Sequence, residues 1–124
     1  MNELVKLHVV HRDLKPANIL YTRGVFKLAD FGLAKYIDHE CQLLKTQAGT
    51  PFYMAPQILL HEKYTSKCDI WSLGIIYYQL LFGKIPWAPC KDSELAYKIK
   101  TTPLTFPQSI TPKSRRLIEG MLAY

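Results

Sequence analysis

The chain has 124 residues, enough for one domain or part of one, and 48% of them are hydrophobic, which argues against a disordered protein. The net charge is +6, but the lysines and arginines are spread along the chain without a run of five, so nucleic acid is not an expected partner. The most apolar segment, residues 70–82, is too short to cross a bilayer, so a membrane is not an expected partner either.

The three cysteines, Cys41, Cys68 and Cys90, stand far apart, and none belongs to a CxxC pair. Zinc sites typically use such closely spaced pairs, so a zinc site is not expected. An odd number of cysteines without a recognisable signal sequence predicts an intracellular, cytoplasmic location.

In chain order, the first predicted elements are two short strands, residues 19–21 and 25–29. Residues 22–24, Thr-Arg-Gly, lie between them and are typical of a hairpin turn. Residues 31–63 keep neither a helical nor a strand period, which predicts a long loop. Long loops in compact domains usually have a function.

The strongest helical pattern covers residues 66–82, which are apolar on almost every face and therefore predict a central helix. Ser66 is the expected N-cap, and Asp69 stands three residues later as in a capping box. Gly83 is expected to end this helix.

Two shorter helices are predicted near the end of the chain. The first covers residues 93–100 with Ser93 as its cap, and the second covers residues 112–122 with Thr111 as its cap. The predicted fold is therefore mainly α with a short β-hairpin.

Three polar residues flank the predicted hairpin. Asp13 and Asn18 precede its first strand, and Asp30 follows its second. Because a tight hairpin brings its two ends together, these oxygen-bearing side chains are expected to converge on a site suited to Mg²⁺. Lys15 adds a positive charge at the same edge, and such a set suits phosphoryl transfer.

Four sequence motifs occur in order along the chain: HRDLKPANIL at residues 11–20, DFG at 30–32, GTPFYMAP at 49–56 and DIWSLG at 69–74. In these motifs the chain resembles the eukaryotic protein kinases, and the serine/threonine branch is the more similar one. The resemblance implies a truncated large, C-terminal lobe of a protein-kinase-like fold, with ATP and Mg²⁺ as cofactors. It also implies a protein substrate with a serine or threonine acceptor.

The resemblance assigns catalytic roles to three residues. Asp13 matches the base that accepts the proton of the substrate hydroxyl, Lys15 matches the lysine that contacts the transferred phosphate, and Thr50 matches the threonine bonded to the catalytic loop. Asn18 and Asp30 match the residues that bind Mg²⁺ and, through it, the nucleotide, which Lys15 also contacts.

Regulation is implied at Thr46, which stands where many kinases have an activating phosphate. Arg12 and Lys35 match the cations that bind such a phosphate. An upstream activating kinase is therefore a possible partner. The alternative is that Thr46 is an ordinary loop threonine that is not phosphorylated.

Structural support of the site is implied for His11, Phe31 and Asp69. His11 and Phe31 match packing residues beneath the site. Asp69 has two compatible interpretations, because it fits a capping box in its own helix and also matches the aspartate that bonds the backbone of the catalytic loop.

Some features of a complete kinase domain are not found in the sequence. Its six glycines are too widely spaced for a G-x-G-x-x-G loop, and no V-A-I-K-like strand precedes His11. We therefore expect residues 1–124 to be a partial kinase domain, without the small lobe, the helix that leads into the catalytic loop, or the final helices. Gln57 replaces a glutamate that normally pairs with a late arginine.

The function implied is ATP-dependent phosphoryl transfer to serine or threonine hydroxyls of proteins. Because positioning of the nucleotide accounts for much of such catalysis, the isolated chain is expected to be weakly active or inactive. The alternative is a non-catalytic kinase-like interaction module or decoy, which Gln57 and the expected absence of the small lobe favour.

Overall fold

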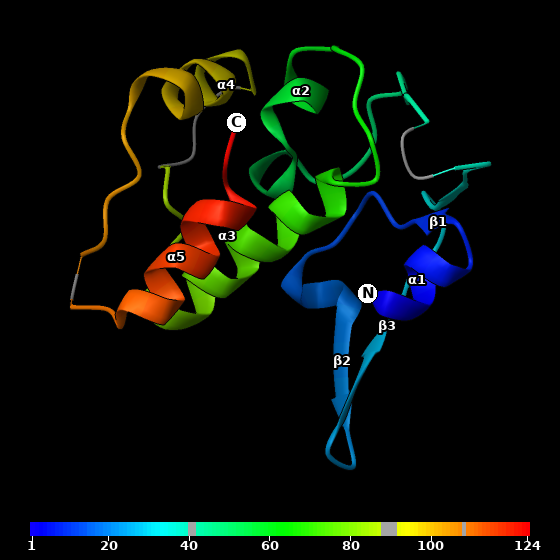
Figure 1. The fold of residues 1–124 in the computed structure, drawn as a ribbon, viewed down its shortest axis with the longest axis horizontal. Coiled ribbons are helices and arrows are strands. Elements are labelled where there is room, and N and C mark those ends of the chain that lie inside the picture. The colour runs from blue at the N-terminus through cyan, green and yellow to red at the C-terminus, as the bar shows by residue number, and fades with distance from the viewer. Residues whose placement is uncertain (40–41, 88–91, 108) are drawn as a thin grey trace.

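A computed structural model describes residues 1–39, 42–87, 92–107 and 109–124. Within these residues the protein is mainly helical, with two separate two-stranded antiparallel sheets (Figure 1). In chain order the elements are α1 (Asn2–Lys6), β1 (Val9–Val10), the 3₁₀ helix η1 (Pro16–Asn18), β2 (Ile19–Thr22), β3 (Val25–Leu28), β4 (Lys35–Tyr36), the 3₁₀ helix η2 (Pro51–Tyr53), α2 (Pro56–Leu59), α3 (Cys68–Phe82), α4 (Asp92–Thr101) and α5 (Pro112–Met121).

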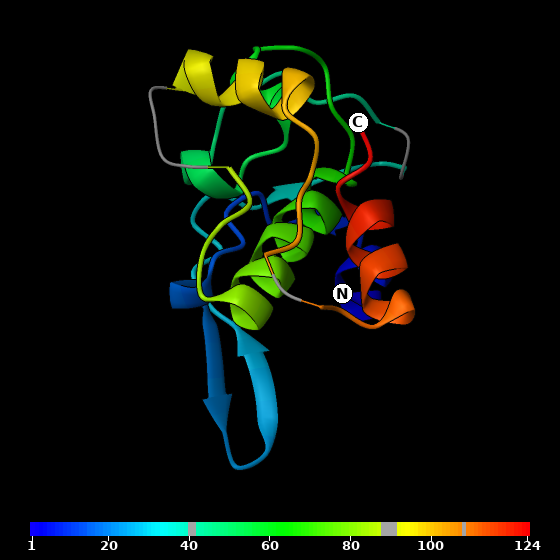
Figure 2. The same cartoon turned by 90° about the vertical axis from the view of Figure 1, so that its left-hand side faces the viewer.

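The predicted hairpin is confirmed, with strand ends that differ by one residue. Strands β2 and β3 pair from Ile19 opposite Leu28 to Thr22 opposite Val25. The turn between them has positive φ at Arg23 (48°) and Gly24 (79°), a backbone that follows the natural twist of paired strands. The hairpin projects away from the helices (Figure 2).

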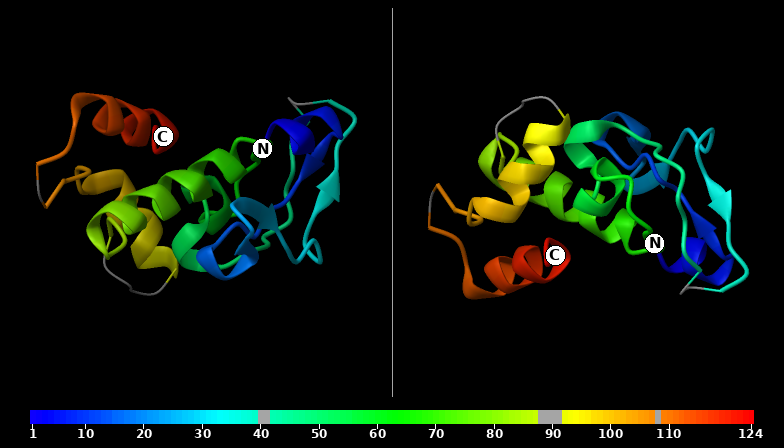
Figure 3. Two further views of the ribbon diagram at one scale, coloured as in Figure 1. Left: turned by 90° about the horizontal axis from the view of Figure 1, so that it is seen from below. Right: turned by 90° about the horizontal axis from the view of Figure 1, so that it is seen from above.

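Helix α3 is the centre of the fold, as its apolar sequence predicts, and its Trp71 and Tyr78 are buried in the main core. Helix α5 runs beside it (Figure 3). Gly74 allows this approach, because a Cβ atom at Gly74 would lie 2.8 Å from side-chain atoms of both Met121 and Leu122. Any larger residue at this position would push the two helices apart.

The predicted start of α3 is wrong, and its predicted end is correct. The helix begins at Cys68, two residues after the expected cap Ser66, with Lys67 in the N-cap position. The carboxylate of Asp69 is used by a distant loop. Gly83 ends the helix with φ 70°, and its N–H donates to the carbonyl of Gln79 at 2.8 Å.

The segment predicted as a long loop, residues 31–63, contains β4, η2 and α2. Strand β4 pairs with β1, with Lys35 opposite Val10. Further along, Leu44 and Tyr64 form an isolated antiparallel bridge. Elements of two to four residues are too short to show a period, so the sequence pattern does not reveal them.

The two predicted C-terminal helices are both present. Helix α4 starts at Asp92, one residue before the predicted cap Ser93. At α5 the cap is confirmed, because Thr111 Oγ1 accepts the backbone N–H of Ser114 at 3.2 Å. In the parts of the chain that the structure describes, no helix combines the length and apolar character needed to cross a bilayer.

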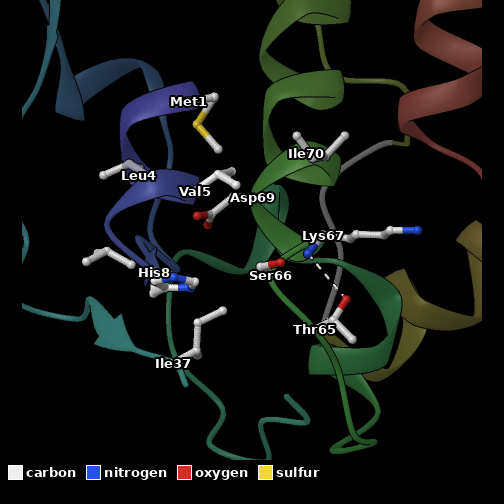
Figure 4. A pocket seen from close by; sticks show the side chains of 11 residues that line it. Met1, Leu4, Val5, His8, Ile37, Thr65, Ser66, Lys67, Asp69 and Ile70 are labelled. Atoms are coloured by element: carbon white, nitrogen blue, oxygen red, sulfur yellow. Dashed lines mark hydrogen bonds between the residues drawn. The ribbon is translucent and has the colours of Figure 1, made fainter. Parts of the chain in front are cut away.

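The residues before His11, where no helix was expected, form the five-residue helix α1. An apolar pocket of about 340 Å³ separates α1 from the start of α3. Val5 of α1 and Ile70 of α3 line this pocket, and the carboxylate of Asp69 projects from α3 toward α1 (Figure 4).

Candidate functional site

The polar residues of the loop between β1 and β2 form one hydrogen-bonded cluster with Thr50. Lys15 Nζ lies 2.8 Å from Asp13 Oδ2 and 3.0 Å from Thr50 Oγ1. Thr50 donates its hydroxyl to Asp13 Oδ1 at 2.8 Å. Asn18 Nδ2 donates to the carbonyl of Asp13 at 2.9 Å and lies 3.2 Å from its Oδ2. The structure therefore brings together four of the residues predicted for the site.

Asp13 is held as a carboxylate by this cluster. Burial alone would raise the pKa of Asp13, but the hydrogen bonds and positive charge of Lys15 and the hydrogen bonds of Thr50 outweigh it and lower the pKa. The side chain is only slightly exposed, so it keeps its negative charge at neutral pH in a fixed orientation. Such a group can accept a proton from an approaching hydroxyl.

Asp69 positions the backbone of this loop from the start of α3. Its two carboxylate oxygens accept the N–H groups of His11 at 2.8 Å and Arg12 at 2.9 Å. Asp69 is 1% exposed, and this burial raises its pKa against the effect of those two hydrogen bonds. The expected bond from Asp69 to the loop backbone is therefore present.

The ring of His11 connects the same loop to the end of the hairpin. Its Nε2 donates to the carbonyl of Ala29 at 3.0 Å, and its Nδ1 faces the N–H of Asp13 at 3.4 Å. The ring packs against Phe31, with centroids 4.8 Å apart. His11 and Phe31 thus lie as the expected packing pair beneath the site.

Gly49 is a further residue of the site that the sequence interpretation missed. Its φ is 117°, and a Cβ atom there would come within 2.4 Å of the carbonyl oxygen of Arg12. Thr50 follows directly, so the close approach of Gly49 sets the distance from Thr50 to Asp13. The signal available in the sequence was the glycine at the start of the GTPFYMAP motif.

The two residues expected to bind metal lie at neighbouring ends of the hairpin. The N–H of Ala29 donates to the carbonyl of Asn18 at 2.9 Å, so Asp30 follows directly after this contact. Asp30 is exposed with φ 59°, and its Oδ1 accepts the N–H of Gly32 at 3.2 Å. Among the described residues, no hydrogen bond joins Asp30 to Asn18 or Asp13, and no group of three metal-binding acidic, His or Cys side chains is present.

These two residues fit a hard cation such as Mg²⁺ in their chemistry. The amide nitrogen of Asn18 donates to Asp13, so the amide oxygen is the atom that would coordinate the metal. Asp30 adds an exposed carboxylate. Mg²⁺ is commonly bound through one or two protein oxygens and completes its shell with water and phosphate oxygens.

Thr46 was expected to carry a regulatory phosphate and Arg12 and Lys35 to bind it, and among the described residues no hydrogen bond or ion pair joins these three residues. Thr46 is exposed, and its carbonyl accepts the hydroxyl of Tyr64 at 2.6 Å. Arg12 donates Nε–H to the carbonyl of Leu33 at 2.6 Å, and its Nη1 is buried without a partner. Lys35 is exposed on β4.

Comparison with known proteins agrees with the motifs and the cluster around Asp13. A family model described as the protein kinase domain matches residues 1–124. The chain is 40% identical to the serine/threonine-protein kinase YPK2/YKR2 of Saccharomyces cerevisiae over 124 residues, covering 99% of this chain and 18% of that protein. It is 40% identical to the serine/threonine-protein kinase gad8 of Schizosaccharomyces pombe, covering 96% of this chain and 21% of that protein.

A third relative is calcium-dependent protein kinase 4 of Plasmodium berghei, 41% identical over 128 residues, with 96% of this chain and 24% of that protein covered. The chain thus spans about a fifth of the length of these relatives. The family match over the whole chain establishes that this protein belongs to the protein kinase family, with serine/threonine kinases among its relatives.

Proposed function

We propose that this chain is the catalytic part of the large lobe of a serine/threonine protein kinase, which transfers the γ-phosphoryl group of ATP to hydroxyl groups of protein substrates. The observation that supports this most is the contact of Asp13 with both Lys15 and Thr50, at 2.8 Å in each case. A lysine two residues after the aspartate is the pattern of serine/threonine kinases, and here its ammonium group reaches the carboxylate.

The hydrogen bonds of Asp13 indicate where a substrate hydroxyl would bind. Among the described residues, Oδ2 already accepts from Lys15 and Asn18, whereas Oδ1 accepts from Thr50 alone. Each carboxylate oxygen can accept about two hydrogen bonds, so the free position is on Oδ1. The substrate hydroxyl would donate there, its oxygen would form the bond to the γ-phosphorus, its proton would pass to Asp13, and ADP would leave.

Lys15, together with Mg²⁺ held by Asn18 and Asp30, would neutralise the negative charge of the nucleotide phosphates. Lys15 lies between Asp13 and Thr50 and presents a positive charge beside the position of the acceptor. Asn18 and Asp30 would hold Mg²⁺ through oxygen atoms. When bound, Mg²⁺ neutralises negative charge on the phosphates, and positioning together with such neutralisation supplies most of the catalysis in phosphoryl transfer.

Thr46 is proposed as the site of an activating phosphate added by an upstream kinase. Its side chain is exposed, and the unpaired Nη1 of Arg12 is a donor suited to a phosphate oxygen. Lys35 would supply a second cation.

A second candidate function is a non-catalytic module that binds a kinase or its substrate. Gln57 favours this candidate, because its neutral amide replaces the glutamate that anchors the substrate loop in kinases. Against it stands the complete set of Asp13, Lys15, Asn18 and Asp30, which a module without catalytic activity would not need.

One experiment on the endogenous protein separates the two functions. An antibody against residues 93–112 would capture the protein from its own cells, and its mass and its transfer of labelled phosphate from ATP to a serine peptide would both be measured. A product at least about twice the mass of the 124-residue chain that phosphorylates the peptide is expected for a kinase. A product of the chain's own mass without transfer would support the module instead.

A further inference from the structure

Ser72 is a polar residue buried in the central helix α3. It is 6% exposed, and its hydroxyl oxygen lies 2.7 Å from the carbonyl oxygen of Tyr53 and 3.1 Å from that of Cys68. A hydroxyl group has one proton to donate, so the shorter distance indicates that Tyr53 is the main acceptor. Ser72 therefore connects α3 to the 3₁₀ helix η2, and not only to the preceding turn of its own helix.

The bond from Ser72 reaches the catalytic candidates through the backbone of η2. The N–H of Tyr53 donates to the carbonyl of Thr50 at 3.0 Å, and the hydroxyl of Thr50 donates to Asp13 Oδ1 at 2.8 Å. The side chain of Tyr53 makes a separate bond to α3, from its hydroxyl to Gln79 Oε1 at 2.9 Å. Of these two bonds, the bond from Ser72 is the one that acts on the backbone of η2.

Ser72 and Asp69 stand on the same face of α3, because they are three residues apart in the helix. Asp69 accepts two backbone N–H groups of the loop directly before Asp13. Ser72 holds the segment that follows Thr50. One helix face thus fixes both segments that meet at the bond between Asp13 and Thr50.

The surroundings of Ser72 make its hydroxyl hard to replace. In the described structure, Asp13, Thr50, Tyr53 and Ser72 line one small space together, and this space has no room for a water molecule. Removing the hydroxyl would therefore leave the carbonyl of Tyr53 without this donor unless η2 moves. Such a movement would displace Thr50 relative to Asp13.

We propose that Ser72 is a positioning residue, which fixes the backbone of η2 so that Thr50 keeps its hydrogen bond to the carboxylate of Asp13. The effect on phosphoryl transfer rests on the proposed function, whereas the coupling of Ser72 to Asp13 does not. Burial raises the pKa of Asp13, and the hydrogen bonds of Lys15 and Thr50 lower it. The pKa of this carboxyl therefore reports whether Thr50 is in place.

Four proteins test the coupling: wild type, Ser72→Ala, Thr50→Val and the double variant. NMR titration of the Asp13 carboxyl carbon in the 124-residue chain measures its pKa in each. Ser72→Ala and Thr50→Val are each expected to raise the pKa of Asp13. In the double variant the pKa should equal that of Thr50→Val, because Ser72 acts through Thr50. An unchanged pKa in Ser72→Ala, or rises that add in the double variant, would overturn the proposal.

Ser114→Ala is the matched control. The hydroxyl of Ser114 connects α5 to α3, at 3.1 Å from the hydroxyl of Tyr77, so its loss is expected to lower stability without changing the pKa of Asp13. An equal rise in this control would overturn the proposal, because it would reflect general loosening. Ser72→Cys keeps a weaker donor and is expected to give a pKa between those of wild type and Ser72→Ala. If Ser72→Ala does not fold, Ser72→Cys decides by the same comparison.

Phosphoryl transfer to a serine peptide by the full protein tests the consequence for catalysis. Ser72→Ala is expected to lower kcat about 10–10²-fold with an unchanged KM for ATP, since a small displacement of a catalytic group has effects of this size. Ser114→Ala is expected to keep the kcat of the wild type. If Asp13→Asn lowers kcat and Ser72→Ala does not, the positioning role fails. If the wild type shows no transfer, or Asp13→Asn leaves it unchanged, the proposed function fails, and the pKa comparison still decides the coupling of Ser72 to Asp13.

Discussion

The carboxylate of Asp69 accepts the backbone N–H of His11 at 2.8 Å across 58 positions of the chain. Its second oxygen accepts the N–H of Arg12 at 2.9 Å. Because Asp69 stands in the first turn of the most buried helix, these two bonds attach the loop that holds Asp13 directly to the core. The orientation of the candidate catalytic carboxylate is therefore set from α3.

Asp69→Asn is expected to destabilise the protein by about 1–3 kcal/mol. The amide keeps one acceptor oxygen but presents N–H₂ to a backbone N–H, so one buried donor loses its partner. The free energy of unfolding in urea measures this change. Asp38→Asn, at an exposed carboxylate, is the control and should have little effect. Equal losses in the two variants would contradict the anchoring role of Asp69.

Gly49→Ala is expected to destabilise the protein by about 1–3 kcal/mol, because φ is 117° and the added methyl would meet the carbonyl of Arg12 at 2.4 Å. Gly120→Ala is the matched control within α5. Nothing lies within 4 Å of its added Cβ, so a gain of about 0.5–1 kcal/mol is expected there. Thermal unfolding of the two variants measures both changes. Unchanged stability of Gly49→Ala would show that the approach of Gly49 to the Arg12 carbonyl is not rigid.

The low pKa of Asp13 predicts how stability depends on pH. Because the folded state holds the Asp13 carboxyl below its ordinary pKa, the unfolded state takes up this proton first as the pH falls. The stability from this group is complete above the unfolded pKa and is lost as the pH falls through the folded value. Below about pH 4, the unfolding free energy of the wild type should therefore fall more than that of Asp13→Asn.

That comparison is made by urea unfolding at a series of pH values. A difference between the two proteins that stays constant on acidification would mean that the pKa of Asp13 is not lowered in the folded state. Thr50→Val is expected to raise the pKa of Asp13, since it removes the hydrogen bond to Oδ1. Titration of the Asp13 carboxyl carbon by NMR would detect this rise.

Tyr64 is expected to restrain the segment that contains Thr46. Its hydroxyl donates to the Thr46 carbonyl at 2.6 Å, and its backbone pairs with Leu44. Tyr64→Phe keeps the buried ring and removes only the hydroxyl, at a cost of about 1 kcal/mol. Proteolysis near Thr46 should become several-fold faster, whereas Tyr97→Phe, at an exposed ring, should leave the rate unchanged.

The sequence predicted those parts of the fold that depend on local patterns. The hairpin follows from the turn at Arg23 and Gly24 between two apolar runs, and the length of α3 follows from its apolar residues up to Gly83. The hairpin and the motifs predicted a cluster around Asp13, and Lys15, Asn18 and Thr50 do bond to it. Asp30, which was expected to converge with Asp13 and Asn18, instead accepts the N–H of Gly32.

Contacts between distant parts of the chain were harder to predict. The start of α3 lies at Cys68, two residues after the predicted cap, and the bonds of Asp69 to His11 and Arg12 link residues far apart in the sequence. The close approach of Gly49 to Arg12 depends on tertiary packing, which a single sequence does not contain. Short elements such as β4 and α2 owe their existence to the neighbours with which they pair or pack, not to periodicity.

The measurement that tests the central claim most directly uses a chimera. Residues 1–124 would replace the matching segment of the Saccharomyces cerevisiae kinase YPK2/YKR2, so that the rest of a kinase surrounds the Asp13 site. We expect the chimera to phosphorylate a serine peptide, and Asp13→Asn to lower kcat about 10²–10⁴-fold, with Asp38→Asn unchanged. A folded chimera whose rate does not depend on Asp13 would contradict the assignment of Asp13 as the base for phosphoryl transfer.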